Sequence, residues 1–472
     1  MAKELLPKKS DNISEWYTSV IQLADLADYG PVKGTMIIKP YGYAIWEAIQ
    51  KSLDGHIKQK GIGNAYFPLF IPMSFLEKEK NHIEGFSPQL AVVTYAGGEK
   101  LDEPLVVRPT SETVIYDSYA KWIQSWRDLP LMMNQWCNIV RWEKRTMPFM
   151  RTSEFLWQEG HTAHATHEEA VEIQNWAMDT YARVYREDLA INGYSGYKSV
   201  SERFAGAETT LSFESLMPSG KVVQSCTSHD LGQNFSKVFE ISFQNQQGSD
   251  EFVWQTSWGL STRSIGALIL AHGDDNGLCL PPKIAPTQVV IIPARINDEV
   301  VAYCETLLAE LLAGNIRALF DGGDNESFGF KLNKWEAKGA PIVLKVGPKE
   351  IEAGTITCRR RDTLTDNQMD RKDAVNSVHK TLDDIQNDML ASSTRYRDEN
   401  TRTANNYEEF KALIKEHKGF IKVFWNDDAK VEKMIKDETK ATSRCRLDEK
   451  SEGTDFYTGK PASDVWLFAQ SY

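Results

Sequence analysis

A strand–loop–strand pattern over residues 135–161 is the feature that most constrains the fold of this chain. Apolar and aromatic runs at residues 136–142 and 155–157 flank a short connection, which is typical of an antiparallel hairpin. The connection carries several basic side chains. The sequence therefore predicts a hairpin whose basic tip meets phosphate.

Two arginines stand inside segments that are otherwise apolar. Arg141 lies in the first apolar run, where an unpaired guanidinium would carry a large desolvation cost. Arg263 has the same problem within residues 254–273, which read as a strand, a glycine turn at Gly259 and an apolar helix. A guanidinium can hold a phosphate or a carboxylate through two parallel hydrogen bonds. A salt bridge on an exposed strand face would explain one such arginine, but two favour an anion-binding pocket.

The stretch at residues 106–113 allows two interpretations. A helical pattern follows it to about Trp126, so Thr110 or Ser111 could cap the helix while Glu112 favours the positive end of its dipole. Alternatively, a hydroxyl and a carboxylate two residues apart at a loop-to-helix turn can bind a secondary ammonium, which offers two N–H donors and one positive charge.

Residues 220–235 read as an apolar strand that runs into a polar turn. A turn explains serine and threonine, but not the combination of Gln224, Thr227 and His229. These three side chains favour a polar site at the end of the strand.

Three histidines recur every third residue at His161, His164 and His167. The spacing permits a metal site, but a helix expected over residues 171–189 makes a solvated polar face the favoured interpretation. We expect neither a metal ion at these histidines nor a zinc site elsewhere.

The N-terminal part has two further patterns. Residues 36–57 begin as a short apolar run and then place apolar side chains at helical intervals, which predicts a strand leading into an amphipathic helix. Residues 64–72 read as an apolar strand broken by proline.

Three segments, residues 36–72, 141–161 and 254–273, resemble in order motifs 1, 2 and 3 of the class II aminoacyl-tRNA synthetases. In detail the chain resembles the prolyl-tRNA synthetases of the archaeal and eukaryotic type. The resemblance implies an α+β catalytic domain with an antiparallel sheet, then an α/β anticodon-binding domain and a small α+β C-terminal domain. It also implies a homodimer built through motif 1, and ATP-dependent attachment of proline to tRNA(Pro) through a prolyl-adenylate.

The resemblance assigns residue roles, with Arg141 and Arg263 as the catalytic pair. The implied ATP-binding residues are Arg141, Glu143, Arg151, Thr152, Phe155, Gln224, Thr227 and Arg263. The implied proline-binding residues are Thr110, Glu112, Arg141, Trp157, Glu159, His161, Phe204 and His229. Gln224 would hold Mg²⁺ together with ATP, while Phe155 and Arg263 would enclose the adenine. A synthetase for another amino acid and a non-catalytic paralogue remain the alternatives.

Prolines 281, 282 and 286 predict a boundary near residue 284, so the catalytic domain would cover residues 1–284. Beyond it the chain alternates between strands (289–292, 316–319, 342–346) and helices (298–312, 328–338), which implies a small sheet covered by helices. By resemblance, residues 285–395 form the anticodon-binding domain, and Glu336 contacts an anticodon base. The chain has Val343-Leu344-Lys345 where that family would have Arg-Leu-Glu. The basic run at residues 359–361 could meet phosphate or form a solvated charged turn.

A charged helix expected over residues 374–390 leads to a third domain, residues 396–472. In this subgroup the domain is often built on four zinc-binding cysteines, but here Cys445 is its only cysteine. We therefore expect an apolar core without zinc, with Tyr472 turned back toward the catalytic domain. The expected core residues are Val423, Trp425, Phe456, Trp466 and Phe468.

Composition excludes several classes of protein. A net charge of −12 argues against a general nucleic-acid binder and confines RNA contacts to local basic patches. The six cysteines are widely spread with no CxxC pair, and no apolar stretch is long enough for a signal or a membrane span. We expect a cytoplasmic protein with free thiols. The chain between residues 159 and 220 is also too short for the inserted editing domain of many bacterial relatives.

Overall fold

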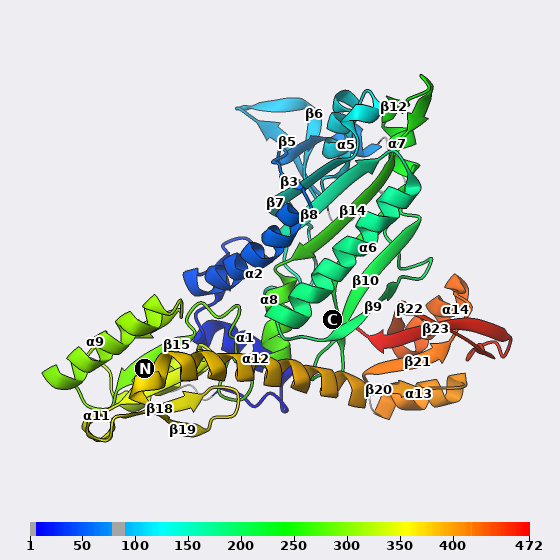
Figure 1. Cartoon of the computed structure of the whole chain (residues 1–472). Helices are drawn as coiled ribbons and strands as arrows, with labels where there is room; N and C mark the ends of the chain where they lie inside the picture. The colour runs from blue at the N-terminus through cyan, green and yellow to red at the C-terminus, as the bar shows by residue number, and fades with distance from the viewer. Residues whose placement is uncertain (1–5, 78–89, 417) are drawn as a thin grey trace.

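A computed structural model describes residues 6–77, 90–416 and 418–472. Its central element is a mixed sheet in which eleven strands can be described (Figure 1). In spatial order they are β20 (Thr401–Thr403), β21 (Phe420–Phe424), β23 (Pro461–Gln470), β22 (Ala441–Thr454), β9 (Gly193–Tyr197), β10 (Thr209–Leu216), β11 (Val222–Gly232), β14 (Trp254–Ser261), β8 (Glu154–His164), β7 (Leu131–Val140) and β3 (Gly63–Asn64). The antiparallel pairing from β9 to β7 confirms the expected catalytic fold.

The predicted hairpin is present as β7 and β8, paired from Leu131↔Ala163 to Val140↔Glu154. The strands are longer than the sequence indicated, because polar residues in them are buried within the sheet. Arg141 was expected inside the first strand, but β7 ends at Val140. Arg141 therefore begins the connection, where its backbone N–H donates to the Ser153 carbonyl at 2.9 Å.

Helix α6 (His167–Arg183) packs across one face of this sheet and continues as a π-helical turn, η3 (Val184–Asp188) (Figure 1). Ala170, Ile173, Ala177 and Tyr181 recur at helical spacing and are buried against the sheet. The helix begins four residues earlier than expected, because the Thr166 hydroxyl accepts a hydrogen bond from the Glu169 N–H and caps it.

Two strand predictions need correction. Residues 64–72 do not form one strand, since β3 joins the main sheet while β4 (Phe70–Pro72) pairs with β6 (Glu99–Val107), the partner of β5 (Ala91–Ala96). The polar residues of 220–235 do not lie in a turn, because β11 continues to Gly232. Likewise, Gly259 lies inside β14 and not in a turn.

Other N-terminal predictions hold. Strand β2 (Met36–Ile38), which pairs with β1 (Ala27–Tyr29), leads into α2 (Pro40–Gln59) as expected. Helix α1 (Ile13–Leu23) buries Trp16 and Tyr17 in the same core as α2. Helix α5 (Glu112–Trp122) ends before the expected Trp126, which begins the short 3₁₀ turn η2 (Trp126–Asp128). The remaining short elements here are α3 (Met73–Glu77), α7 (Asn234–Val238), β12 (Ser242–Gln244) and β13 (Asp250–Phe252).

The second domain has a sheet in the order β16 (Ala318–Phe320), β15 (Val289–Pro293), β17 (Ile342–Val346), β18 (Thr355–Arg360) and β19 (Asp366–Asp370). Its helices are α9 (Asp298–Ala313), α10 (Phe328–Ala337) and α11 (Pro348–Ala353). All five units expected between residues 289 and 346 are present. Strand β15 pairs in parallel with both β16 and β17, as expected for strands connected through helices.

The basic run of this domain is neither a solvated turn nor an open phosphate site. Arg359 donates to Glu336, Arg360 pairs with Asp362 and Asp388, and Arg361 makes two hydrogen bonds to Asp274 of the catalytic part, at 2.6 and 2.7 Å. Each guanidinium is thus paired with at least one carboxylate that lies more than 20 residues away in the sequence.

Helix α12 (Ala374–Glu399) follows the turn η4 (Arg371–Asp373) and spans the molecule from the second sheet to the C-terminal strands (Figure 1). The C-terminal strands extend the catalytic sheet, since β22 pairs with β9 at Arg446↔Tyr197. Helices α13 (Tyr407–Glu416) and α14 (Ala429–Thr439) complete this part. Among the helices that the structure describes, none is both long enough and apolar enough to cross a membrane.

The expected C-terminal core is confirmed. All five predicted apolar residues are buried in one cluster, in which Trp425 and Trp466 meet edge to face at 4.9 Å between ring centroids. Cys445 is fully buried on β22. Tyr472 does turn back toward the catalytic part, where its hydroxyl lies 2.7 Å from that of Ser219.

Candidate active site

A cavity of about 270 Å³ opens among β8, β11, β14 and the first residues of α5 and α8 (Arg263–His272). All eight residues predicted to bind proline line this cavity. Five of the predicted ATP-binding residues line it too, namely Arg141, Phe155, Gln224, Thr227 and Arg263. The structure thus brings together residues that are up to 153 positions apart, from Thr110 to Arg263.

The start of helix α5 bears on the two interpretations of Thr110 and Glu112, because it shows what the hydroxyls of Thr110 and Ser111 contact. Ser111 holds the N-cap position, but its hydroxyl donates to the Glu159 carboxylate and not to the helix. The Thr110 hydroxyl donates to the Glu112 carboxylate, which is only 4% exposed. Neither hydroxyl caps the helix, so the pair belongs to the cavity wall.

Glu159 and His161 form a buried pair on β8, with Nε2 of His161 3.1 Å from Oε2 of Glu159. Burial opposes ionisation of Glu159, but the hydrogen bond and charge of His161, with hydrogen bonds from Ser111 and Gln135, leave its pKa below the usual value. Burial likewise opposes protonation of His161, yet Glu159 and Glu112 raise its pKa. The Glu159 carboxylate is therefore ionised at neutral pH.

His229 also lines the cavity, but in a different protonation state. Burial first, and then the nearby charge of His161, lower the pKa of His229 to about 3, so its imidazole is neutral. Its Nδ1 lies 2.9 Å from the Thr210 hydroxyl, and its ring lies 4.6 Å from that of Phe204 between centroids. These contacts fix the plane of the imidazole, so His229 presents a flat, uncharged ring to the cavity.

Arg141 lies between the acidic end of the cavity and Arg263. Its Nε donates to the Pro109 carbonyl at 3.0 Å, and its guanidinium lies 5.6 and 5.5 Å from the ring centroids of Phe155 and Trp157. Burial and the charge of Arg263 lower its pKa to about 10, opposed by Glu112, Glu159 and Glu143. Arg141 therefore remains a cation at neutral pH.

Arg263 is the first residue of α8, where the helix dipole also favours an anion. Its Nε donates to the Met150 carbonyl at 3.1 Å and its Nη1 to the Gln224 carbonyl at 3.4 Å. Burial and the charge of Arg151 lower the pKa of Arg263. Two backbone carbonyls thus hold the guanidinium at the mouth of the cavity.

A second, basic cavity of about 380 Å³ adjoins the first, because Glu202, Gln224 and Arg263 line both. Its basic residues are Arg145, Arg151, Arg263 and Arg444. The site therefore has two chambers, an inner one with carboxylates and histidines and an outer one with arginines.

The other residues predicted to bind ATP lie near this outer chamber. Arg151 lines it, and Glu143 lies 3.8 Å from Arg151 as an ion pair. Thr152 is buried, and its hydroxyl donates to the Glu154 carbonyl at 2.7 Å. Thr152 thus lines neither chamber but holds the turn at the start of β8.

Sequence reasoning missed a charged network behind the cavity wall. Lys198 and Glu202 line the inner chamber, and the Lys198 ammonium lies 3.4 Å from the Glu214 carboxylate. The same carboxylate accepts hydrogen bonds from Arg444 of the C-terminal part at 2.7 and 3.0 Å. No local pattern signals this group, because the residues come from the segment after β9, from β10 and from β22.

The three regularly spaced histidines do not converge on one site. His161 faces the cavity, whereas Nε2 of His164 lies 2.8 Å from the Thr162 hydroxyl, and Nε2 of His167 lies 2.7 Å from Asp230. Glu336 is in α10 of the second domain, where it is largely buried and accepts a hydrogen bond from Arg359 at 2.5 Å.

Comparison with protein families gives three matches in chain order. The model described as "tRNA synthetase class II core domain (G, H, P, S and T)" matches residues 95–272. The model "Anticodon binding domain" matches residues 288–381, and "Prolyl-tRNA synthetase, C-terminal" matches residues 407–472.

Whole-chain comparisons give relatives of similar length. The chain is 49% identical to a "Proline--tRNA ligase" from Rubrobacter xylanophilus, over 100% of this chain and 99% of the relative. It is 48% identical to another from Cytophaga hutchinsonii, over 99% and 100%. The crystal structure of prolyl-tRNA synthetase from Cryptosporidium parvum, complexed with halofuginone and AMPPNP, superposes with a TM-score of 0.95 at 39% identity and covers 99% of both chains.

Proposed function

Because the chain belongs to the prolyl-tRNA synthetases, a family of class II proline–tRNA ligases, we propose that it attaches proline to tRNA(Pro) in an ATP-dependent reaction. The two-chamber cavity is the observation that carries this function. A secondary ammonium suits the inner carboxylates, a triphosphate suits the outer arginines, and Arg141 lies where the two would meet. We infer that the reaction proceeds through a prolyl-adenylate.

Proline would enter the inner chamber with its ammonium toward Thr110 and Glu112. These two oxygen-bearing side chains can accept both N–H bonds and match the positive charge. Trp157, Phe204 and the neutral His229 would contact the ring, while Glu159 and His161 complete the polar wall. The proline carboxylate would then reach Arg141.

ATP would place its phosphates among the outer arginines and its adenine between Phe155 and Arg263. The proline carboxylate attacks the α-phosphorus, a new P–O bond forms, and pyrophosphate leaves with the electrons of the broken bond. Arg141 holds the attacking carboxylate and the α-phosphate together, so this step needs positioning and charge stabilisation but no side-chain nucleophile. The terminal ribose hydroxyl of tRNA then attacks the adenylate carbonyl, and AMP leaves.

Magnesium fits this site as a companion of ATP. Mg²⁺ prefers oxygen ligands and keeps several waters. Gln224 and Glu202 offer side-chain oxygens where the two chambers meet. We propose that Gln224 helps hold Mg²⁺, which when bound would offset the negative charge of the pyrophosphate group.

Amino-acid specificity provides the direct test. In ATP–pyrophosphate exchange with each of the twenty amino acids, we expect the highest kcat/KM with proline. We also expect measurable exchange with alanine, because a pocket that fits proline cannot exclude a smaller side chain and each missing methylene costs only about 1 to 3 kcal/mol. Equal or greater activity with another amino acid would overturn the assignment.

Hydrolysis of mischarged tRNA is not expected. Residues 165–221 are occupied by α6, η3, β9, β10 and their connections, all of which belong to the main sheet and its covering helix. Purified alanyl-tRNA should therefore remain intact with this protein, compared with a buffer control. Rapid deacylation would show an editing site within the chain.

We further propose a homodimer formed through the segment that resembles motif 1. Four large apolar side chains there are exposed, namely Ile37 (53%), Tyr43 (40%), Tyr66 (73%) and Phe70 (48%). Exposed apolar side chains gathered in one segment favour a protein interface.

Substitution tests this interface. Ile37→Glu should convert a dimer into a monomer at micromolar concentration, measured by light scattering, because a charge would be buried without a partner. Leu312→Glu is the matched control, since Leu312 is similarly exposed (51%) but lies on α9 of the second domain. A monomeric wild-type protein, or dimers of unchanged stability in both Ile37→Glu and Tyr66→Glu, would refute the interface.

The remaining assignments are also proposals. We propose domain boundaries near residues 284 and 395, which lie close to the ends of the family matches. We propose that Glu336 contributes to anticodon binding, supported by its place within the matched anticodon-binding segment. We propose a C-terminal domain held together without zinc, supported by its continuous apolar cluster. We propose a cytoplasmic location, supported by six cysteines that form no disulfide within the described residues.

A further inference from the structure

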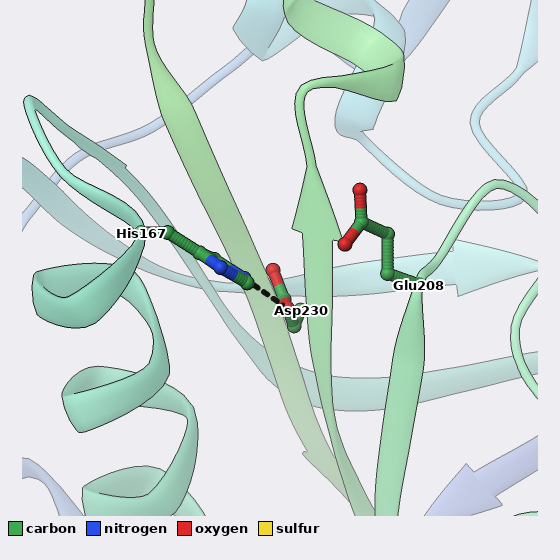
Figure 2. A group of neighbouring side chains, drawn as sticks. All are labelled: His167, Glu208 and Asp230. Atoms are coloured by element: carbon green, nitrogen blue, oxygen red, sulfur yellow. Dashed lines mark hydrogen bonds and ion pairs between the residues drawn. The ribbon is translucent and has the colours of Figure 1, made fainter.

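Three side chains that bind metals in many proteins meet where α6 begins against β11 (Figure 2). His167 is the first residue of α6, Asp230 lies on β11, and Glu208 directly precedes β10. One donor atom from each residue lies within 4.8 Å of the other two. None of the three lines the inner or the outer chamber, so the cluster is separate from the site described above.

Two of the three donors are held firmly in place. The Asp230 carboxylate is 2% exposed and receives hydrogen bonds from the Gly232 N–H at 2.8 Å and from His167 Nε2 at 2.7 Å. The His167 ring stacks on the Trp254 ring at 4.4 Å with an interplanar angle of 23°. The imidazole and the buried carboxylate are therefore oriented by neighbours that would not themselves bind an ion.

Glu208 reaches this place because Gly232 has no side chain. A Cβ at Gly232 would lie 2.1 Å from Oε1 of Glu208, and Gly232 has a φ of +53°. Within the part of the chain that the structure describes, no hydrogen-bond donor or cation contacts the Glu208 carboxylate. Two carboxylates thus face one imidazole.

The sequence favoured a solvated polar face at these histidines, but His167 meets two carboxylates from other parts of the chain. Against that expectation, we propose that His167, Glu208 and Asp230 bind one divalent first-row transition-metal ion through Nε2 and one oxygen of each carboxylate. An imidazole with two carboxylates suits Zn²⁺, Co²⁺ or Mn²⁺ better than Mg²⁺ or Ca²⁺, which prefer oxygen ligands alone. Bonds of about 2.0 to 2.2 Å place tetrahedral donors roughly 3.3 Å apart, so the exposed Glu208 side chain would close toward the other two. Water would fill the remaining position.

Binding would exchange a proton for the metal ion. Nε2 of His167 lies 2.7 Å from the Asp230 carboxylate, and any proton between them would be released to solvent as that nitrogen binds the ion. The ion would then join the starts of α6 and β10 to β11. The ion would be connected to the active site through β11, because His229 directly precedes Asp230 in this strand and lines the inner chamber.

Calorimetric titration of the full-length protein tests the site. Wild-type protein that has been stripped with chelator and dialysed into millimolar Mg²⁺ should bind Zn²⁺ at one site. The His167→Gln variant should lack this site. Glu208→Gln should weaken that site by at least about tenfold, since loss of supporting contacts alone weakens metal sites by about 10- to 100-fold. Glu169→Gln is the matched control, because Glu169 is an exposed carboxylate in the same helical turn but outside the cluster.

Measurements of thermal stability and activity distinguish a metal site from an ion pair with a purely structural role. Glu208→Gln is nearly isosteric at an exposed position, so it should melt like the wild type without Zn²⁺ and lose only the Zn²⁺-dependent rise in Tm. Metal-free Glu208→Gln should keep wild-type ATP–pyrophosphate exchange with proline. Identical Zn²⁺ isotherms for the wild type, His167→Gln and Glu208→Gln would overturn the proposal. So would a wild-type protein that binds no Zn²⁺ at about 0.1 mM.

Discussion

Replacing Arg141 with alanine is expected to lower proline-dependent ATP–pyrophosphate exchange by at least about a hundredfold. The guanidinium lies between the inner carboxylates and Arg263, where it would touch both the proline carboxylate and the α-phosphate. Losing a charge-stabilising contact of this kind costs about 2 to 4 kcal/mol of transition-state stabilisation. The Pro109 carbonyl fixes Arg141 in this position. Arg263 cannot take its place, because two backbone carbonyls hold the Arg263 guanidinium.

The controls for Arg141 separate charge, geometry and folding. Arg141→Lys keeps the positive charge but loses the planar fork, so it should recover only part of the lost activity. Lys144→Ala removes an exposed cation from the same connection and should leave exchange within about twofold of wild type, as most surface substitutions are mild. Exchange by folded Arg141→Ala within about threefold of wild type would contradict the assigned role.

Replacing Glu112 with glutamine should raise the KM for proline by roughly tenfold to a hundredfold, because a hydrogen bond to a charged group contributes about 1.5 to 3 kcal/mol. Glutamine keeps the shape of the side chain and can still accept the Thr110 hydroxyl, but it removes the negative charge that would face the secondary ammonium. The KM for ATP should stay within about threefold, since the phosphates of ATP would lie among the arginines of the outer chamber.

Asp117→Asn is the matched control for Glu112→Gln. Asp117 also lies on α5, but its carboxylate pairs with Lys121 on the exposed side of that helix. Both KM values should therefore remain near wild type in this variant. If Glu112→Gln raised the two KM values together, or changed neither, Glu112 would be a residue of helix structure and not of proline recognition.

Local patterns predicted much of the fold. The β7–β8 hairpin, the β2–α2 unit and the five elements between residues 289 and 346 all follow from apolar spacing and turn residues in short windows. Errors occurred where a polar side chain faces a buried cavity. Gln224, Thr227 and His229 looked like a turn because strand patterns treat such residues as solvent-facing, yet β11 continues through them.

The candidate site was predicted as a set of residues but not as an arrangement. Resemblance to family motifs indicated the eight proline-binding residues, and all eight line one cavity. It could not indicate that Ser111 would bond Glu159 and not cap α5, since both outcomes use the same hydroxyl at the same helix start. The choice depends on the carboxylate that β8 brings next to it.

The sequence by itself determined the local elements, the two arginines within apolar segments and the likeness to a synthetase, because helical period, strand alternation and motif wording are properties of neighbouring residues. Only the tertiary structure decided which buried charges meet. Glu214 and Arg444 are 230 residues apart, yet they form one ion pair that joins the C-terminal part to the wall of the inner chamber. Burying either charge alone would cost several kcal/mol, so the partner that offsets this cost is set by how β10 and β22 pack together and not by any sequence pattern.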